Sequence, residues 1–156
     1  GITISAVDVA YDGVKVLNKA DIAIPKNHTI ALVGESGSGK TTLANIVTGL
    51  VTPNNGQIYI DDAPLREYDL KKYRSKIGYI SQDSVVFNDT IFNNVTFWAE
   101  PTPENYERFW KVVEMASLKK FIDQQSKKEQ TPLGDNGILI SGGQKQRISI
   151  ARELFK

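Results

Sequence analysis

Eight consecutive residues constrain the fold of this 156-residue chain more than any other feature. Residues 34–41 read GESGSGKT, which satisfies the pattern G-x-x-x-x-G-K-[ST] at every fixed position. An apolar run precedes the loop at residues 30–33, and apolar side chains at helical spacing follow it, at Leu43, Ile46, Val47 and Leu50. A glycine loop between a buried strand and an amphipathic helix predicts a fold of the α/β class.

The residue types of this loop suit a nucleoside triphosphate. Glycines let backbone N–H groups point inward around phosphate oxygens, and the N-terminus of the following helix adds the positive end of its dipole. Lys40 offers a mobile ammonium group to the outer phosphates. The hydroxyl of Thr41 is placed to bind Mg²⁺. The loop therefore predicts binding of a nucleoside triphosphate together with Mg²⁺.

Composition excludes several other ligands and sites. The 19 Lys and Arg residues are balanced by 18 Asp and Glu residues, so no excess of positive charge is available to hold nucleic acid. The absence of cysteine excludes disulfides, thiolate metal sites and a cysteine nucleophile. No apolar stretch approaches the ~20 residues that a membrane-spanning helix needs. The only histidine, His28, lies in a polar turn and is expected to be solvated.

Hydrophobic periodicity places strands and helices on both sides of the loop. Alternation and short apolar runs predict strands over residues 2–11, 14–17, 20–24, 29–33, 57–60 and 77–80. Helical spacing predicts two further helices, over residues 103–118 and 144–155. Thr102 is the expected N-cap of the first, with Pro103 at its first position. The aromatic stripe of that helix is expected to face the core, with Tyr106, Phe109 and Trp110.

A second glycine-containing stretch precedes the last helix. Residues 140–144 read ISGGQ, which places a serine and two glycines at a helix N-terminus. Such an end can bind an anion through its free backbone N–H groups. An ordinary N-cap followed by flexible glycines explains the same residues equally well.

With both stretches in one chain, the sequence resembles the nucleotide-binding domain of an ATP-binding cassette (ABC) transporter over all 156 residues. In that family the first glycine loop is Walker A and the second stretch is the signature motif. The resemblance implies a P-loop NTPase with a parallel sheet core, an antiparallel β lobe and an α-helical lobe. Two departures leave the phosphate contacts untouched: Ile140 stands for the usual leucine, and Asp61 with Asp62 for an Asp-Gly turn.

The resemblance also implies a set of site residues for ATP and Mg²⁺. Tyr11 resembles the aromatic residue that stacks on adenine, and Gln82 the glutamine that touches Mg²⁺ and the attacking water. Lys40 and Gln82 are then the catalytic residues, and Thr41 and Gln82 the metal-contacting ones. The expected nucleotide-binding residues are Tyr11, Val16, Ser36, Gly37, Ser38, Gly39, Lys40, Thr41 and Thr42, joined in trans by Ser141, Gly142, Gly143 and Gln144 of a second domain.

The resemblance further implies partners. Two such domains pair head to tail, and a transmembrane domain holds them at the cytoplasmic face of a membrane. Residues 88–95 and 131–137 resemble stretches typical of exporter cassettes, the latter the X-loop that helps couple the cassette to its membrane partner. Aromatic residues cluster after Gln82, and ordinary packing and a groove for a helix of the membrane domain explain them equally well: Phe87, Phe92, Phe97 and Trp98.

The family's organisation predicts three parts: a β lobe with the Walker A core over residues 1–83, a helical lobe over 84–144, and the start of the post-signature helix over 145–156. The chain ends before the strand that carries the family's Walker B aspartate and catalytic glutamate, and it opens at Gly1 without a methionine. We therefore expect a partial domain that binds ATP and hardly hydrolyses it.

Two other functions remain open at this point. One is a soluble ABC-class ATPase that takes no part in transport, and the other is a non-catalytic nucleotide-binding module. The short distance between Walker A and the signature, together with the X-loop-like run, favours an exporter.

Overall fold

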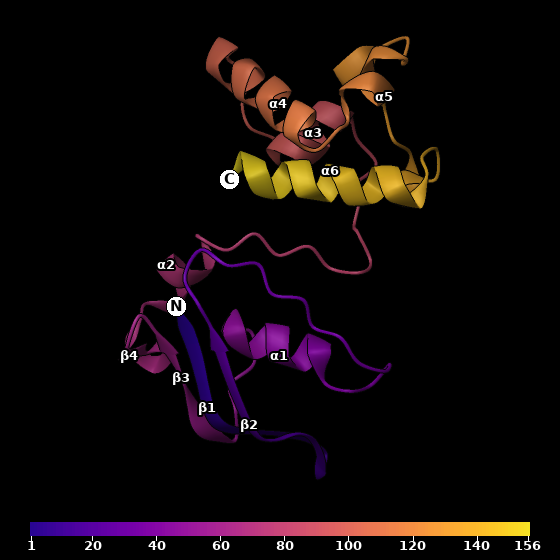
Figure 1. Ribbon diagram of the computed structural model, residues 1–156. Helices are drawn as coiled ribbons and strands as arrows, with labels where there is room; N and C mark the ends of the chain where they lie inside the picture. Colours follow the sequence, from indigo (N-terminus) through magenta and orange to yellow (C-terminus); the bar gives the residue numbers. More distant parts are fainter. The chain divides into compact units, whose positions relative to one another are not determined.

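Antiparallel strands dominate the first half of the chain and helices the second in the computed structural model, which describes residues 1–156. The chain forms two compact units, Gly1–Ile77 and Gly78–Lys156 (Figure 1). Within Gly1–Ile77 lie all four strands, and within Gly78–Lys156 lie the longer helices. The division into lobes at residues 83 and 84 stays a prediction.

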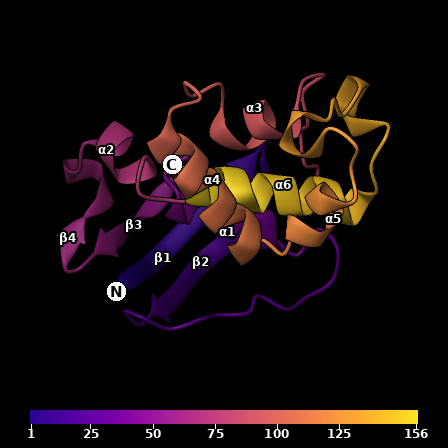
Figure 2. The same ribbon diagram turned by 90° about the horizontal axis from the view of Figure 1, so that it is seen from above.

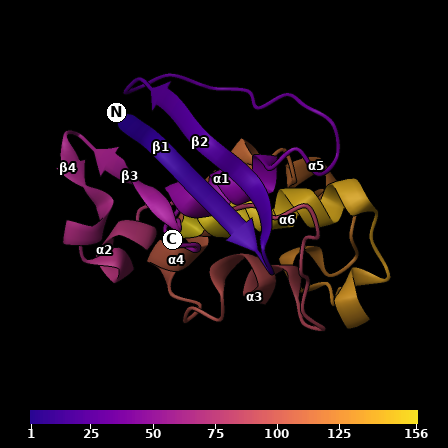
Figure 3. The same ribbon diagram turned by 90° about the horizontal axis from the view of Figure 1, so that it is seen from below.

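One four-stranded antiparallel sheet, in the order β2-β1-β3-β4, organises the first unit. The strands are β1 (Ile2–Tyr11), β2 (Val14–Ile24), β3 (Asn55–Ile60) and β4 (Ala63–Pro64). Asp12 and Gly13 join β1 to β2 with φ of 49° and 80°, the left-handed geometry that a two-residue hairpin requires. Figure 3 shows β1 and β2 side by side. The two strands predicted at 14–17 and 20–24 are thus one strand, with an irregularity at Lys19.

The core of the first unit lies between this sheet and helix α1 (Lys40–Val47). Leu43 and Ile46 are the buried side chains of α1, as the helical spacing predicts. Leu50, which the same spacing placed on this face, lies beyond the end of the helix and is exposed. Leu43 and Ile46 pack with Ile58 of β3 and with three buried residues of β1, which are Ile4, Val7 and Val9. The 3₁₀ turn η1 (Leu65–Glu67) and the short helix α2 (Leu70–Arg74) complete this unit. Its packing fixes the helix that begins directly after the glycine loop.

Four helices build the second unit: α3 (Ile91–Thr96), α4 (Pro103–Met115), α5 (Lys119–Asp123) and α6 (Gly142–Phe155). Two 3₁₀ turns, η2 (Lys128–Gln130) and η3 (Asp135–Gly137), lie between α5 and α6. The Thr102 hydroxyl accepts a bond from the Asn105 N–H at 3.2 Å, so the predicted N-cap with Pro103 at the first position is confirmed. Figure 2 shows these helices from above.

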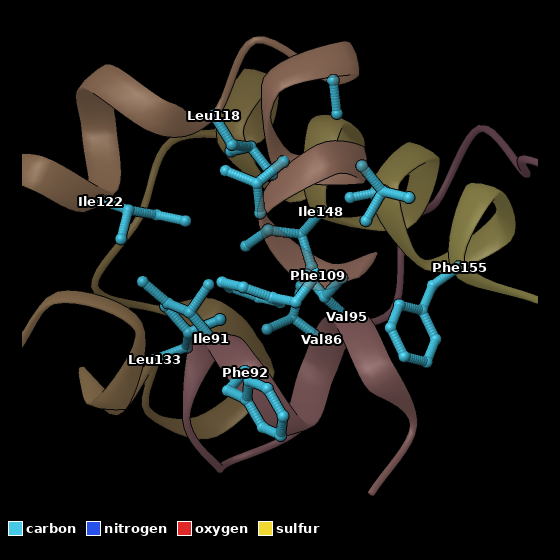
Figure 4. Packing of buried hydrophobic residues seen from close by; sticks show 14 residues of the cluster. Val86, Ile91, Phe92, Val95, Phe109, Leu118, Ile122, Leu133, Ile148 and Phe155 are labelled. Carbon is cyan, nitrogen blue, oxygen red and sulfur yellow. The ribbon is translucent and has the colours of Figure 1, made fainter. Parts of the chain in front are cut away.

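Phe109 lies at the centre of the second core. Its side chain is 0 % exposed, and in Figure 4 it points among Ile91, Val95 and Ile148, which come from α3 and α6. The ring centroid of Phe92 lies 5.2 Å from that of Phe109, so Phe92 belongs to this core and not to a surface groove. The predicted core face of α4 is confirmed, with Tyr106 and Trp110 partly buried against the same cluster.

The strands predicted at residues 29–33 and 77–80 are absent, and with them the parallel sheet core. Val33 is 94 % exposed, although its run is the most apolar of the first unit. Parallel strands depend on neighbours on both sides and on cover over both faces. In the first unit the sheet ends at β2 and β4, and residues 29–33 pair with neither. The antiparallel and helical parts are confirmed.

Each helix of the structure is too short or too polar to cross a lipid bilayer.

Candidate functional site

The glycine loop closes around the ammonium group of Lys40. Lys40 Nζ donates to the carbonyl oxygens of Gly34 at 2.8 Å and Glu35 at 2.6 Å, and to Ser38 Oγ at 3.3 Å. A further bond from the Ser38 N–H to the Glu35 carbonyl, 3.2 Å long, tightens the turn. A positive charge is therefore fixed at the centre of a loop whose partners are neutral oxygens.

Two glycines of the loop have backbone conformations that other residues rarely adopt. Gly37 has φ of 82° and Gly39 has φ of 89°. Gly39 is also crowded, because a Cβ atom there would lie 2.9 Å from Leu17 Cδ2 and 3.2 Å from the carbonyl oxygen of Val16. The structure thus brings Val16, from the neighbouring strand β2, against the end of the loop. A side chain at position 39 would push β2 and the loop apart.

The first turn of α1 presents uncapped backbone donors. Gly39 is the N-cap and has no side chain to accept from them, and the bond from the Leu43 N–H to the Gly39 carbonyl at 2.8 Å is the first of the helix. The N–H groups of the residues before Leu43 have no carbonyl partner within an α-helix. Thr41 and Thr42 lie in this turn, with Thr41 exposed. Uncapped donors beside a fixed ammonium group suit a polyphosphate.

The residues of this turn also fit Mg²⁺ held jointly with phosphates. No group of three or more His, Cys, Asp or Glu side chains that could hold a metal ion is present. Mg²⁺ accepts such a setting, because it commonly takes one or two protein oxygens and completes its shell with phosphate oxygens and water. The exposed Thr41 hydroxyl can supply one of them.

Tyr11 lies in the same unit as the loop, at the end of β1. It pairs with Val14 across the hairpin turn, and its side chain is 46 % exposed. An exposed ring at this place can stack on a planar ligand. The loop, Val16 and Tyr11 therefore all belong to the first unit.

Gln82 and the signature residues belong to the second unit. Gln82 is exposed in an irregular segment, because the strand predicted before it at residues 77–80 is absent. Ser141 and Gln144 form a capping box at the start of α6: Ser141 Oγ accepts from the Gln144 N–H at 3.3 Å, and Gln144 Oε1 accepts from the Ser141 N–H at 2.8 Å. Gly142 and Gly143 are exposed with open space around them. The N-cap interpretation is confirmed, and anion binding there stays a prediction.

The residues that resemble an X-loop are attached to the start of α3. The Ile91 N–H donates to the Thr131 carbonyl and the Leu133 N–H to the Asp89 carbonyl, each at 3.0 Å. Gly137 is buried with φ of 62°, and a Cβ atom there would lie 3.2 Å from Val86 Cβ. The two exporter-like stretches, residues 88–95 and 131–137, are therefore in direct contact.

Comparison with known proteins decides the family. The sequence pattern that defines the ABC transporter family matches residues 17–156. The chain belongs to the ABC transporter family. An ATP-dependent lipid A-core flippase of Shewanella sp. (strain MR-4) is 40 % identical over 153 residues, covering 96 % of this chain and 25 % of that protein. The flippase of the same name from Escherichia coli (strain K12) is 39 % identical over 152 residues, covering 96 % and 26 %.

A solved structure supports the same assignment for the fold. The structure of a bacterial Atm1-family ABC exporter with ATP bound matches 99 % of this chain and 27 % of that one, with a TM-score of 0.89 and 30 % sequence identity. This chain spans about a quarter of the length of the flippases and of that exporter chain. The ABC transporter fold predicted from the two motifs is thereby confirmed.

Three residues of this ABC domain that the sequence did not single out organise the surface after Gln82. That surface, here called the aromatic cluster, consists of Phe87, Phe97 and Trp98, whose ring centroids lie 5.0 to 5.8 Å apart. The organising residues are Asp89, Asn94 and Arg152. Asp89 Oδ2 accepts from the Trp98 indole N–H at 2.8 Å. Arg152, near the end of α6, is partly buried. Asp89 and Asn94 lie in the exporter-like stretch 88–95, and this resemblance is the only sequence feature that points to them.

The bond from Trp98 predicts a pH dependence of stability. Together with bonds from Asn93 and from the Thr90 N–H, it holds the pKa of Asp89 below its usual range. A carboxyl with a lowered folded-state pKa stabilises the fold above its unfolded value of about 4, and this contribution is lost as pH falls through the folded value. In thermal unfolding, the midpoint of Asp89→Asn should lie below wild type at pH 6, and the difference should be smaller at pH 2.

An exposed carboxylate of the same segment gives the control. Asp83→Asn should shift the unfolding midpoint little at either pH, because Asp83 is exposed. A difference between wild type and Asp89→Asn that is the same at pH 6 and pH 2 would contradict a role for the ionised carboxylate.

Proposed function

We propose that this chain is the ATP-binding part of an ABC exporter, where it binds Mg-ATP and couples ATP hydrolysis to transport across a membrane. The observation that carries the proposal is the loop closed around Lys40 beside the uncapped first turn of α1. The names of the relatives agree with it, since they are ATP-dependent flippases and an exporter with ATP bound.

In this proposal the chain's own groups bind and orient the triphosphate. The Lys40 ammonium exchanges neutral carbonyl partners for phosphate oxygens, which form stronger charge-assisted bonds. The first-turn N–H groups of α1 donate to the same phosphates, and Tyr11 stacks on the base. Mg²⁺, when bound, would neutralise charge on the phosphates. Thr41 and Gln82 would hold it, and Gln82 would orient the attacking water.

The N-terminus of α6, which carries the signature residues, suits contact with a nucleotide that is bound at the glycine loop of a second chain. A serine hydroxyl has one proton to donate and two acceptor positions. In the capping box Ser141 Oγ acts as the acceptor for Gln144, so its proton remains for a phosphate oxygen. The exposed backbone at Gly142 and Gly143 allows close approach. Two chains paired head to tail would thus surround each ATP with donors from both.

A transmembrane domain would dock on the second unit, with the ATP sites at the cytoplasmic face. The aromatic cluster supports this part of the proposal, because the side chains of Phe97 and Trp98 remain 59 % and 47 % exposed. Exposed aromatic patches of this kind mark interaction surfaces. Hydrolysis of the bound ATP would release the paired domains and so drive the membrane partner between two states.

Gln82→Ala tests the coupling to hydrolysis in the complete protein as its gene encodes it, reconstituted in lipid vesicles. We expect ATP hydrolysis to fall about tenfold, because the water is less well oriented, while the affinity for a non-hydrolysable ATP analogue changes less than twofold. Gln124→Ala, an exposed glutamine of the same unit, is the control.

Binding without hydrolysis in wild type would favour a non-catalytic module. Hydrolysis unaffected by removal of the membrane domain would favour a soluble ATPase.

A further inference from the structure

We propose that Arg152 is a positioning residue, which holds the aromatic cluster in one arrangement and joins it mechanically to the helix that begins at the signature. The inference rests on the proposed function and deepens it. It names the side chain through which the nucleotide end of α6 can act on the surface offered to the membrane partner.

The guanidinium group of Arg152 binds three oxygen atoms around the aromatic cluster. Nε donates to the Asn94 carbonyl at 2.7 Å, Nη1 to the Val85 carbonyl at 3.0 Å, and Nη2 to Asn94 Oδ1 at 3.3 Å. None of these acceptors is charged, and burial lowers the pKa of Arg152 without making it neutral at physiological pH. Because Arg152 is partly buried and binds only neutral oxygens, its hydrogen bonds join α6 to the segment that contains Val85 and Asn94.

The same guanidinium group lies over two rings of the cluster. Arg152 Cζ is 5.3 Å from the Phe87 ring centroid and 5.8 Å from the Phe97 ring centroid, within the range of cation–π attraction. The planar guanidinium group of arginine has five N–H donors, so it can bind separate oxygen atoms and lie over aromatic rings at the same time. A lysine would keep the charge and lose this simultaneous engagement.

The backbone of the cluster needs such support. Phe97 and Trp98 both have left-handed conformations, with φ of 56° and 60°, which bulky residues adopt only when their surroundings impose them. The Trp98 side chain is held by Asp89, and the Trp98 N–H donates to the Asn93 carbonyl at 3.3 Å. Phe97 is exposed, and the guanidinium group of Arg152 lies over its ring. Without the guanidinium group, two strained residues would lose one of their constraints.

Helix α6 connects this cluster with the signature. Its N-terminus is fixed by the Ser141 capping box, and Arg152 lies near its other end. Between the capping box and Arg152, Ile148 and Ala151 are fully buried in the core of the unit, so we expect the helix to move as one rigid element. A displacement of the signature by bound nucleotide would therefore move Arg152 and, through it, the aromatic cluster.

The test compares Arg152→Lys with Arg108→Lys in the complete protein. Arg108 is a matched control, because it also lies over a ring, 4.7 Å from the Phe155 centroid, but belongs to the exposed side of α4. In Arg152→Lys we expect amide hydrogen exchange over residues 85–98 to be about tenfold faster. Exchange over residues 103–115 and affinity for a non-hydrolysable ATP analogue should be unchanged, and ATP turnover should fall severalfold. Arg108→Lys should change none of these.

Two results would overturn the inference. One is unchanged exchange over residues 85–98 in Arg152→Lys. The other is an equal increase over residues 85–98 and 103–115, which would make Arg152 a general stabiliser of the unit. If Arg152→Lys does not fold, Phe87→Leu gives the same comparison, because it removes one ring and keeps the oxygen acceptors, with an expected increase of about threefold. Failure of wild type to bind ATP would overturn the proposed function but not the exchange comparison.

Discussion

Replacing Lys40 by alanine should lower the affinity for ATP by about 10²–10³-fold. The ammonium group is the one charge fixed inside the glycine loop, where three loop oxygens bind it. The expected change amounts to about 3–4 kcal/mol at ~1.4 kcal/mol per tenfold, which lies within the about 2–5 kcal/mol that loss of one partner from a close charge pair costs in binding. Equilibrium titration with a fluorescent ATP analogue measures the affinity directly.

Lys26→Ala is the matched control, because Lys26 is an exposed lysine of the chain segment that leads into the loop. Its removal should change the affinity less than twofold. Circular dichroism should show the same secondary structure for both variants, because the carbonyls left by Lys40 are exposed to water. Equal affinity of Lys40→Ala and wild type would remove the main support for nucleotide binding at this loop.

The glycine loop could be predicted from sequence because its determinants are local. The loop geometry depends on glycines with positive φ at positions 37 and 39 and on a lysine that reaches back to carbonyls five and six residues earlier. The Ser141 capping box joins residues three positions apart, and the Thr102 cap does the same. Interactions of this range are encoded in consecutive residues, so a short motif specifies them.

The apolar runs at 29–33 and 77–80 show where local pattern fails. Both have the composition of buried parallel strands, but a strand exists only where a second segment supplies ladder bonds. The antiparallel strands of the first unit find such partners through a tight hairpin and through β3. No pattern within five residues indicates whether a distant partner is available.

The contacts of Arg152 with the segment around the aromatic cluster could not be predicted for a related reason. Arg152 meets Asn94 across 58 residues of sequence and Val85 across 67. In the sequence Arg152 reads as one of several cations on the polar side of a helix. Its covered position arises because α3 and α6 pack against each other, which only the three-dimensional arrangement reveals.

Replacing Asn94 by leucine should destabilise the second unit by about 3–5 kcal/mol. Asn94 is 0 % exposed, and its Nδ2 donates to the carbonyls of Phe87 at 3.0 Å and Thr90 at 2.9 Å, while Oδ1 accepts from the Phe87 N–H at 2.8 Å. Each buried polar group left without a partner costs about 1–3 kcal/mol. Leucine has a similar size, so the loss reflects hydrogen bonds and not a cavity. Denaturant unfolding followed by tryptophan fluorescence measures it.

Two neighbouring changes separate the donor role from the acceptor role of Asn94. Asn94→Asp keeps the shape and the acceptor, but turns a carboxylate oxygen toward carbonyl oxygens that need a donor, so it should remain strongly destabilising even with Arg152 nearby. Asn93→Ala removes one bond to Asp89 and should cost only about 1 kcal/mol. If Asn94→Leu costs no more than Asn93→Ala, the turn before α3 holds its shape without Asn94. Arg152 would then be the residue that fixes the aromatic cluster, because it binds the Asn94 carbonyl, which no side-chain change removes.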